Sequence, residues 1–357
     1  MKIAYGLAGE GRGHSTRAIP IVRELLRMGH DVQLFTCCDA LEPLIENFGT
    51  QRIHEMPTPK FKYVNGKISS LGTAWDFAVF MAENRKRILT LASELHLGHY
   101  DLVISDFEPL LSRASQVANL PLILYNNQSF SQVCSLPLNL VTQTRKMELT
   151  CRFICPPANL TIVAVPIKAE YPIVSENVII TGPLIKEEVR GRLWKGGGDH
   201  IVLYVRESNV ELFPIFREYA VKNNLKIYAY GNNNLVPMDE DDIIIRRTPS
   251  SLNFINDMLS SKLLITAGGA GVIGEAAYTG TPTIIIPEPR QPEQEMNGFL
   301  AERCYPNMAE LKLNNFTLDE LENKVSTLHG LGERQMEDGT EDVLRAILNF
   351  MKTVNIK

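Results

Sequence analysis

Short apolar runs alternate with segments of helical spacing along this chain, and the alternation starts afresh in the second half. The apolar runs lie at 2–7, 30–38, 101–106 and 120–127 in the first half, and at 200–205, 225–230, 262–267 and 281–287 in the second. Apolar strands that alternate with helices form parallel sheets covered on both faces. The sequence therefore predicts an α/β protein with two doubly wound, Rossmann-like domains, and the cleft between such domains is the default ligand site.

Length and composition agree with two domains. The chain has 357 residues, 45% of them hydrophobic. A chain of this length usually divides into two domains, each with its own hydrophobic core. The segment 165–188 is rich in proline and lacks a helical period, so we place the boundary within it. The predicted domains are 1–182 and 183–340, and 341–357 carries an amphipathic helix that can cross back to the first domain.

Charge and hydropathy exclude several classes of partner. The formal net charge is −5, which gives the chain as a whole no electrostatic reason to approach nucleic acid or an anionic bilayer. The first apolar run is too short for the core of a signal peptide, and no stretch approaches the ~18 apolar residues of a membrane span. We therefore expect a cytoplasmic protein without a nucleic-acid partner.

The cysteines give no sign of a metal centre. They lie at positions 37, 38, 134, 151, 155 and 304, and show neither CxxC nor the paired Cys and His spacing of a zinc site. We expect free thiols with mainly structural roles, and no metal.

A glycine-rich loop, GEGRGH at 9–14, joins the first predicted strand to the first predicted helix. Glycines permit close backbone approach, and unpaired N–H groups at a helix start favour an anionic or hydroxyl-rich ligand. The candidate residues are Gly11, Arg12 and Gly13. A tight turn that needs only positive φ angles is the alternative. An NAD site is disfavoured, because His14 stands where the third glycine of GxGxxG belongs.

The same loop ends in a candidate general base. His14 begins the predicted helix, at the mouth of the expected cleft. Asp106 lies at the carboxyl end of a neighbouring strand, on the edge that faces the same cleft. A carboxylate there would fix the imidazole tautomer and stabilise its cation. A structural histidine and a helix-capping aspartate are the alternatives.

A second glycine-rich loop, at 267–275, follows a strand and opens a helix, so its amides can cradle a pyrophosphate. Its candidate residues are Gly268, Gly269, Ala270, Gly271 and Val272. Glu275 would repel a phosphate unless it accepts hydrogen bonds from ribose hydroxyls; the alternative is that it caps its own helix. The next loop, at 287–297, carries Glu293, Gln294 and Asn297, whose side chains suit sugar hydroxyls unless this is an ordinary solvated loop.

These motifs together resemble a known family. AGGAGVIGEAAYTGTP at 267–282 and PEPRQPEQEMNG at 287–298 look like the donor-binding signature of GT-B glycosyltransferases, and GEGRGHSTR at 9–17 is similar to the N-terminal loop of the MurG-like branch. The similarity in order and spacing extends over nearly the whole chain. It implies an inverting transfer of a hexose or N-acetylhexosamine from a nucleotide diphosphate sugar, most commonly UDP-linked. No cofactor is implied, and no metal is required.

The resemblance also implies roles for single residues and domains. Residues 1–182 would bind the acceptor and 183–340 the donor. His14 takes the position of the base and Asp106 that of its acidic partner. The donor residues carried over are Gly269, Ala270 and Gly271 for the phosphates, Glu275 for the ribose, and Glu293 with Gln294 for the sugar.

Two positions depart from the family pattern. Relatives carry a glycine- or serine-rich loop after the first strand of the donor domain, where this chain has YVRESN at 204–209. Arg206 and Ser208 either replace the lost amide contacts to the diphosphate or lie away from it. Ala267 stands where many relatives have His or Arg, which removes one phosphate contact.

The sequence does not distinguish whether the acceptor is a lipid, a glycan or a small molecule. Its specificity is expected around 60–76 and at 126–129, where Asn127 and Gln128 are candidates. The segment 133–155 mixes apolar and basic residues, so it either touches the inner face of a membrane that carries a lipid acceptor or forms an ordinary helix with a solvated face. Two rival functions remain: a nucleotide-sugar 2-epimerase, and a non-catalytic protein that binds nucleotide-sugars.

Overall fold

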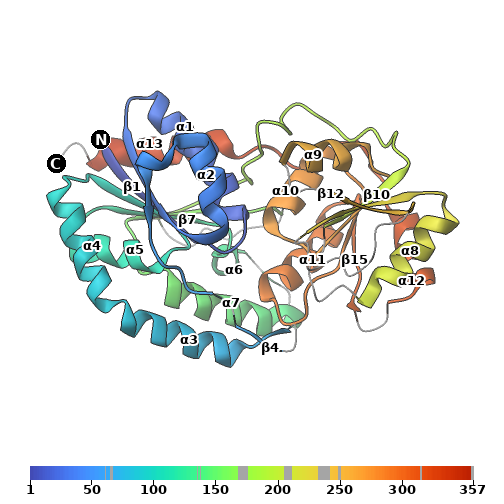
Figure 1. Cartoon of the computed structure of the whole chain (residues 1–357), viewed down its shortest axis with the longest axis horizontal. Coiled ribbons are helices and arrows are strands. Elements are labelled where there is room, and N and C mark those ends of the chain that lie inside the picture. The colour runs from blue at the N-terminus through green and yellow to red at the C-terminus, as the bar shows by residue number, and fades with distance from the viewer. Residues whose placement is uncertain are drawn as a thin grey trace.

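The computed structural model describes residues 1–60, 62–64, 67–134, 136, 138–167, 176–204, 211–231, 242–247, 251–313 and 316–354. It shows two parallel sheets, each covered by helices, which lie side by side along the longest axis of the molecule (Figure 1). The expected α/β class with two doubly wound domains is confirmed.

The first sheet is built from the N-terminal half of the chain. Its described strands are parallel, in the order β3 (Ile53–Glu55), β2 (Asp31–Thr36), β1 (Lys2–Leu7), β6 (Leu102–Asp106), β7 (Leu122–Asn126), β8 (Leu160–Ala164) and β9 (Val178–Thr181). Strands β6 and β7 are buried along their whole length, because helices cover both faces. Leu7 pairs with Asp106, so β1 and β6 end side by side.

Helices cover the two faces of this sheet in an alternating pattern. Ile3 and Tyr5 of β1 pack with α1, whereas Ala4 between them packs with α4 and α5 on the other face. The elements between the strands are α1 (Gly13–Arg27), η1 (Cys38–Ala40), α2 (Leu41–Phe48), η2 (Thr50–Arg52), the hairpin β4 (Tyr63–Val64) and β5 (Lys67–Ile68), α3 (Ser70–Glu83), α4 (Arg85–Leu97), α5 (Pro109–Val117), α6 (Phe130–Val133), η3 (Leu138–Leu140) and α7 (Val141–Ile154).

The second sheet repeats this design. Its described strands are parallel, in the order β12 (Ile244–Arg247), β11 (Lys226–Tyr230), β10 (His200–Tyr204), β13 (Leu263–Thr266), β14 (Thr283–Ile285) and β15 (Met308–Glu310). The helices around it are α8 (Phe213–Lys222), α9 (Ser251–Ser260), α10 (Ala270–Thr279), α11 (Pro292–Cys304) and α12 (Leu318–Thr327).

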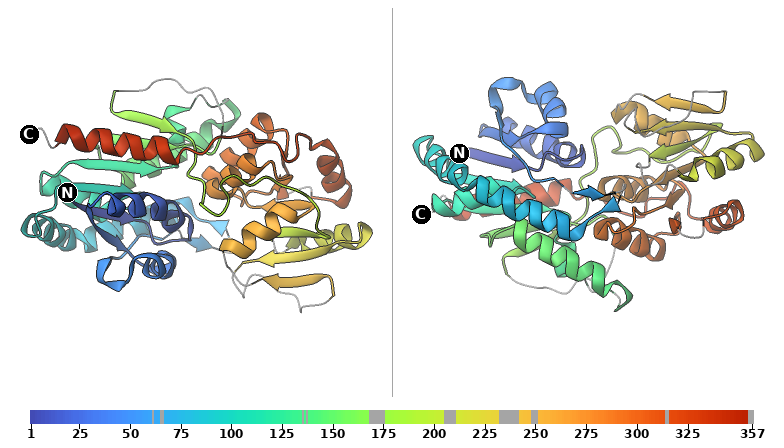
Figure 2. Two further views of the ribbon diagram at one scale, coloured as in Figure 1. Left: turned by 90° about the horizontal axis from the view of Figure 1, so that it is seen from above. Right: turned by 60° about the horizontal axis from the view of Figure 1, so that its bottom comes forward.

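The last helix, α13 (Thr340–Val354), packs on the first sheet. Its buried residues Val343, Ile347 and Met351 share an apolar cluster with Ile21 of α1 and Ile162 of β8. Figure 2 shows α13 in red on the first sheet, where it packs against α1, β8 and β9. The chain therefore passes from the second sheet back to the first before it reaches its C-terminal helix.

The two halves also share an apolar cluster where they meet. Met147 of α7 and Val165 belong to the same cluster as Ile273 of α10 and Met296 of α11. The Tyr305 hydroxyl donates to the carbonyl of Pro166 at 3.0 Å. The halves are thus packed against each other through side chains.

Helix α7 lies in the segment for which a membrane contact and a solvated face are the predicted alternatives. One side packs against α11, where Gln143 donates to Glu295 at 3.0 Å. Leu149 and Phe153 are more than half exposed on another side. No helix within the described residues has the length and apolar composition that a membrane span requires. Contact with a membrane stays a prediction.

Candidate functional site

Both predicted glycine loops lie where the strand order of their sheet reverses. In the first sheet, β2 lies on one side of β1 and β6 on the other; in the second, β11 and β13 flank β10 in the same way. Ligands of open α/β sheets bind outside the carboxyl ends of the strands at such points. The loop 8–12 follows β1, and the loop 267–269 follows β13. The fold therefore brings both loops to the places where ligands bind.

The N-terminal loop is held by the turn that follows β2. The Gly11 amide donates to the Asp39 carboxylate at 2.9 Å, and Gly11 has a φ of +75°, which favours glycine. Arg12 forms an exposed ion pair with Glu42 on α2. Helix α1 then begins at Gly13 without a side-chain cap, so its first amides have no partner from a capping residue.

His14 and Asp106 meet as predicted. Nδ1 of His14 lies 3.0 Å from Oδ1 of Asp106, and the two side chains are 12% and 0% exposed. Their contact follows from the register of β1 with β6 and from the loop that bonds the Ala8 amide to the Asp106 carbonyl at 3.0 Å. Phe107 has a φ of +56° and stacks its ring 6.4 Å from the imidazole. A histidine in contact with a buried carboxylate thus lies at the strand edge.

Sequence reasoning missed the third member of this cluster, Arg17. Its Nε donates to Oδ2 of Asp106 at 2.6 Å, and its Nη2 contacts both Oδ1 of Asp106 and, at 2.7 Å, Nδ1 of His14. Burial opposes the ionisation of Asp106, but the charge of Arg17 and the contacts with His14 outweigh it and hold the pKa of Asp106 below its usual value. Two sequence signals point to Arg17: it lies one helical turn after His14, and it is the last residue of the GEGRGHSTR motif.

The tautomer of His14 decides what this cluster can do. If Nδ1 carries a proton, it donates to Asp106, and Nε2 is left with a lone pair. If Nδ1 lacks a proton, it accepts from Arg17 instead, and Nε2 holds the proton. Only the first arrangement provides a base at Nε2.

The two predicted acceptor residues make different contacts: Asn127 bonds within the first domain, and Gln128 bonds to the second. With its amide oriented to satisfy both bonds, Asn127 accepts from Nη1 of Arg17 at 2.8 Å and donates to the Ala164 carbonyl at 3.0 Å. Asn127 therefore supports the buried cation. Gln128 reaches the other domain, where its Nε2 lies 3.4 Å from Oε2 of Glu293. The structure thus joins a predicted acceptor residue to a predicted donor residue.

At the second glycine loop, no side chain covers the backbone where α10 starts. Gly268 has a φ of +92°, and Gly269, the N-cap residue, provides no side-chain cap. A Cβ added to Gly269 or Gly271 would meet no atom within 4 Å, so the backbone borders open space. Ala270 is buried, and Val272 is half-buried. Arg206 and Ser208 lie outside the described residues.

Glu275 lies inside α10, where it pairs with Lys186 and does not cap the helix. Its Oε1 is 2.9 Å from Nζ of Lys186, and the residue is 2% exposed. Burial lowers the pKa of Lys186, but the charge of Glu275 and the bond to it outweigh this effect and raise that pKa above its usual value. Lys186 lies in the proline-rich segment between the domains, where the sequence gives no signal for it.

The loop before α11 is tightly ordered by its own side chains. Gln294 accepts from the Glu288 amide at 2.9 Å, and Gln291 caps α11 by accepting from the Glu293 amide at 2.9 Å. The buried Asn297 donates to the Gly268 carbonyl at 3.0 Å, which ties this loop to the glycine loop. The two predicted donor motifs therefore form one unit.

Several buried oxygens in this region lack a hydrogen-bond partner. Within the described part of the chain these include Oε1 of Gln128, Oε2 of Glu275 and Oδ1 of Asn297. Most buried polar atoms in proteins have a partner. All three atoms are acceptors, so the group that satisfies them has to supply hydrogen-bond donors. Hydroxyl groups of a sugar are donors of this kind.

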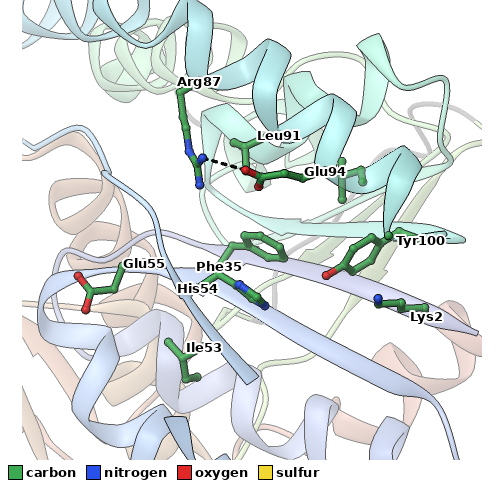
Figure 3. Close-up of a pocket in the computed structure, with 11 residues that line it drawn as sticks. Lys2, Phe35, Ile53, His54, Glu55, Arg87, Leu91, Glu94 and Tyr100 are labelled. Carbon is green, nitrogen blue, oxygen red and sulfur yellow. Dashed lines mark hydrogen bonds and ion pairs between the residues drawn. The ribbon is translucent and has the colours of Figure 1, made fainter. Parts of the chain in front are cut away.

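A cavity of about 550 Å³ lies apart from these residues, beside α4 and β3 (Figure 3). Phe35 stacks on His54 there, Nζ of Lys2 lies over the Tyr100 ring, and Arg87 pairs with Glu94. None of the predicted site residues lines it. Among the described residues, no group of three or more His, Cys, Asp and Glu side chains is arranged to hold a metal ion.

Comparison with known sequences identifies relatives over most of the chain. The sequence pattern of the family described as "Glycosyl transferase family 1" matches residues 1–328. A protein of Methanosarcina mazei that bears the name "Uncharacterized glycosyltransferase" is 28% identical over 328 residues, which cover 85% of this chain and 83% of that protein.

Solved structures share the fold at low sequence identity. The glycotransferase of kitacinnamycin has a TM-score of 0.68 and 14% identity, covering 99% of this chain and 97% of its own. MurG of Acinetobacter baumannii has a TM-score of 0.60 and 13% identity, covering 98% and 100%. The UDP-GlcNAc 2-epimerase of Neisseria meningitidis has a TM-score of 0.61 and 14% identity, covering 98% and 100%. These similarities establish the GT-B fold and leave the activity open.

Removing Arg17 should destabilise the protein, because Asp106 would remain buried without its cation. We expect Arg17→Met to lower the free energy of unfolding at neutral pH by about 3–5 kcal/mol. Chemical denaturation measures this. The matched control is Arg12→Met, which breaks an exposed pair and should cost less than about 1 kcal/mol. Equal effects of the two substitutions would contradict the role of the buried pair.

Glu108, which caps α5, should make stability depend on pH. Its carboxylate accepts from the Leu110 and Leu111 amides at 2.7 Å, but burial raises its pKa from 4.5 to about 7. Between these values the folded state holds a proton that the unfolded state releases, so this group makes stability fall as pH rises.

We therefore expect the stability of the wild type, relative to Glu108→Gln, to decline between pH 4.5 and about 7 and to level off above that. A constant offset is also expected, because the glutamine amide has one acceptor oxygen where the carboxylate has two. Thermal unfolding across this range tests the prediction, with the exposed Glu42→Gln as control. A difference that does not vary with pH would show that folding leaves the pKa of Glu108 unchanged.

Proposed function

The chain belongs to glycosyl transferase family 1, and from this membership we propose that it moves a hexose or N-acetylhexosamine from a nucleotide diphosphate sugar to a hydroxyl acceptor, with inversion. The observation that carries the proposal is the set of unpartnered, buried acceptor atoms on Gln128, Glu275 and Asn297. Glu275 belongs to α10, whose start no side chain caps, and Asn297 donates to the carbonyl of Gly268 in the loop before that helix. A ligand with both phosphates and sugar hydroxyls matches both features.

The donor would bind at α10. Its diphosphate would accept hydrogen bonds from the amides around Gly269 and Gly271, where the backbone borders open space. Ribose hydroxyls would donate to Oε2 of Glu275. Because Glu275 is buried and Gly274 lies against Pro183, a ligand reaches it only if the segment after 182 moves away from α10. Donor binding would thus be coupled to a movement between the domains.

Lys186 would make the carboxylate compatible with the donor. A glutamate close to a diphosphate repels it, and the cation 2.9 Å from Glu275 offsets that repulsion. The raised pKa of Lys186 keeps this side chain charged at neutral pH. A charged lysine at this position would also stabilise the departing nucleoside diphosphate.

His14 would be the base that activates the acceptor. With Nδ1–H bonded to Asp106, Nε2 takes the proton of the acceptor hydroxyl as its oxygen attacks the anomeric carbon. The new glycosidic bond forms on the face opposite the departing diphosphate, so the configuration inverts. Arg17 holds Asp106 in place and is a positioning residue.

The acceptor would approach from the first domain. Gln128, whose amide already bonds to Glu293 across the domain interface, has a free Oε1 for a sugar hydroxyl. A lipid acceptor at a membrane surface is supported by exposed apolar side chains on two adjacent helices, Trp75 of α3 and Phe153 of α7. The rings of Phe77 and Phe153 lie 6.2 Å apart, which places these helices together.

Substitution of His14 tests the mechanism. We expect His14→Ala to lower the release of nucleoside diphosphate by at least about 100-fold, because the base is lost. The dissociation constant of the donor should change little, since donor contacts lie in the other domain. The measurements are product release from UDP- and dTDP-sugars with a panel of lipid, glycan and small-molecule acceptors, and calorimetric titration of the donor.

The control is His96→Ala, which replaces an exposed histidine on α4 and should retain full turnover. Full turnover of His14→Ala would remove His14 from the role of base. Donor incubated without acceptor gives a further test. An isomerised sugar would replace the proposal with a 2-epimerase, and an unchanged sugar supports transfer.

A further inference from the structure

Cys37 and Cys38 form a thiol pair that the proposed reaction does not use. Their Sγ atoms lie 2.8 Å apart at the end of β2. Both thiols are free, as predicted; Cys38 is exposed, while Cys37 is half-buried. Cys134 and Cys151, by contrast, are buried, and burial raises the pKa of their thiols to about 11 and about 12. Burial and the contact with Cys38 also raise the pKa of Cys37, to about 12. Cys38 is therefore the most accessible thiol in the described chain.

The backbone brings the two thiols together. Neighbouring side chains of an extended strand point to opposite faces. Cys37 is extended, but Cys38 has a φ of +58°, a conformation that residues other than glycine rarely adopt. The next residue, Asp39, holds this turn in place: its amide donates to the Gly9 carbonyl at 3.1 Å, and its carboxylate accepts from the Gly11 amide at 2.9 Å. The conformation of the turn thus keeps the two thiols in contact.

The same turn is packed tightly against the loop that carries His14. A Cβ added to Gly9 would lie 2.5 Å from the Cys37 carbonyl oxygen and 2.8 Å from its Sγ. No side chain fits between them, so Gly9 and Cys37 are in direct contact. A displacement of Cys37 must therefore be passed on to the loop 9–13, and with it to the start of α1.

We propose that Cys37 and Cys38 are a reversible oxidation site, which a two-electron oxidant such as hydrogen peroxide closes into a disulfide between adjacent residues, and that closure displaces the His14 loop. The Cys38 thiolate attacks one peroxide oxygen, which gives a sulfenic acid and releases one water after protonation. Cys37 then attacks that sulfur and expels a second water. The two sulfurs lose two electrons and two protons in total, and the peroxide gains them.

The bond between adjacent residues is strained and therefore easy to reduce. Consecutive Cα atoms are about 3.8 Å apart across a trans peptide, below the usual range of about 4.4–6.8 Å for disulfides. Strained, exposed disulfides have high reduction potentials and behave as labile, regulatory bonds. A thiol reductant should therefore restore the open pair.

Mass spectrometry of the full chain tests the modification. We expect the wild type treated with hydrogen peroxide to lose two hydrogen atoms in mass, to lose alkylation at both Cys37 and Cys38, and to recover both thiols with dithiothreitol. Cys38→Ser should block the change, and the control Cys304→Ser should not. Phenylarsine oxide, which bridges paired thiols with loss of one water, should label the wild type but not Cys38→Ser. A bond to any other cysteine, or oxidation of Cys38 to an acid without closure, would overturn the proposal.

Hydrogen exchange tests the link to the loop. We expect amides of residues 9–14 to change their exchange rate on oxidation in the wild type and to be unaffected by peroxide in Cys38→Ser. Unchanged exchange in the oxidised wild type would overturn the coupling. A thermal melt shows whether Cys38→Ser is folded, and Cys38→Ala provides a second variant if it is not. Neither readout involves sugar transfer, so the result is independent of the proposed function.

Discussion

The buried ion pair between Arg17 and Asp106 holds together the part of the first domain from which the site is built. Arg17 belongs to α1 and Asp106 ends β6, so the pair fastens the helix to the strand across the point where the strand order reverses. A buried charge without its partner is costly, so the geometry around the pair is strongly specified. His14 and Asn127 both bond to this pair. The position of the imidazole is a consequence of the pairing.

The contact between the domains supplies the second half of the site. An apolar cluster joins α7 to α10 and α11, and the bond between Gln128 and Glu293 crosses the same interface. The chain passes between the domains twice, once near Gly182 and again before α13, and the carbonyl of Pro183 accepts from the Gly339 amide at 2.8 Å, so the two crossings touch. A relative movement of the domains would bend both crossings together, and Lys186 lies beside them. Access of a ligand to Glu275 would therefore depend on the movement of these two crossing segments.

The sequence predicts the parts of this structure that depend on local patterns. Buried parallel strands appear as continuous apolar runs, and residues at the carboxyl ends of neighbouring strands come together, so the contact of His14 with Asp106 is predictable. The partners that complete the site are set by tertiary packing. Arg17 looks like an ordinary helix residue, Lys186 lies in a segment without periodicity, and the contact between Cys37 and Cys38 occurs at a positive φ angle of Cys38. No local pattern encodes these features.

The central claim is that the second glycine loop and Glu275 bind a nucleoside diphosphate. Thermal unfolding of the wild type and Glu275→Ala with UDP, GDP, dTDP, CMP and NAD tests it most directly. A ligand at 100 times its dissociation constant adds ~2.7 kcal/mol, which raises the melting midpoint of a chain of this size by a few degrees. The account predicts such a rise with one nucleoside diphosphate and its loss in Glu275→Ala. No rise with any diphosphate, or a rise with NAD alone, would contradict it.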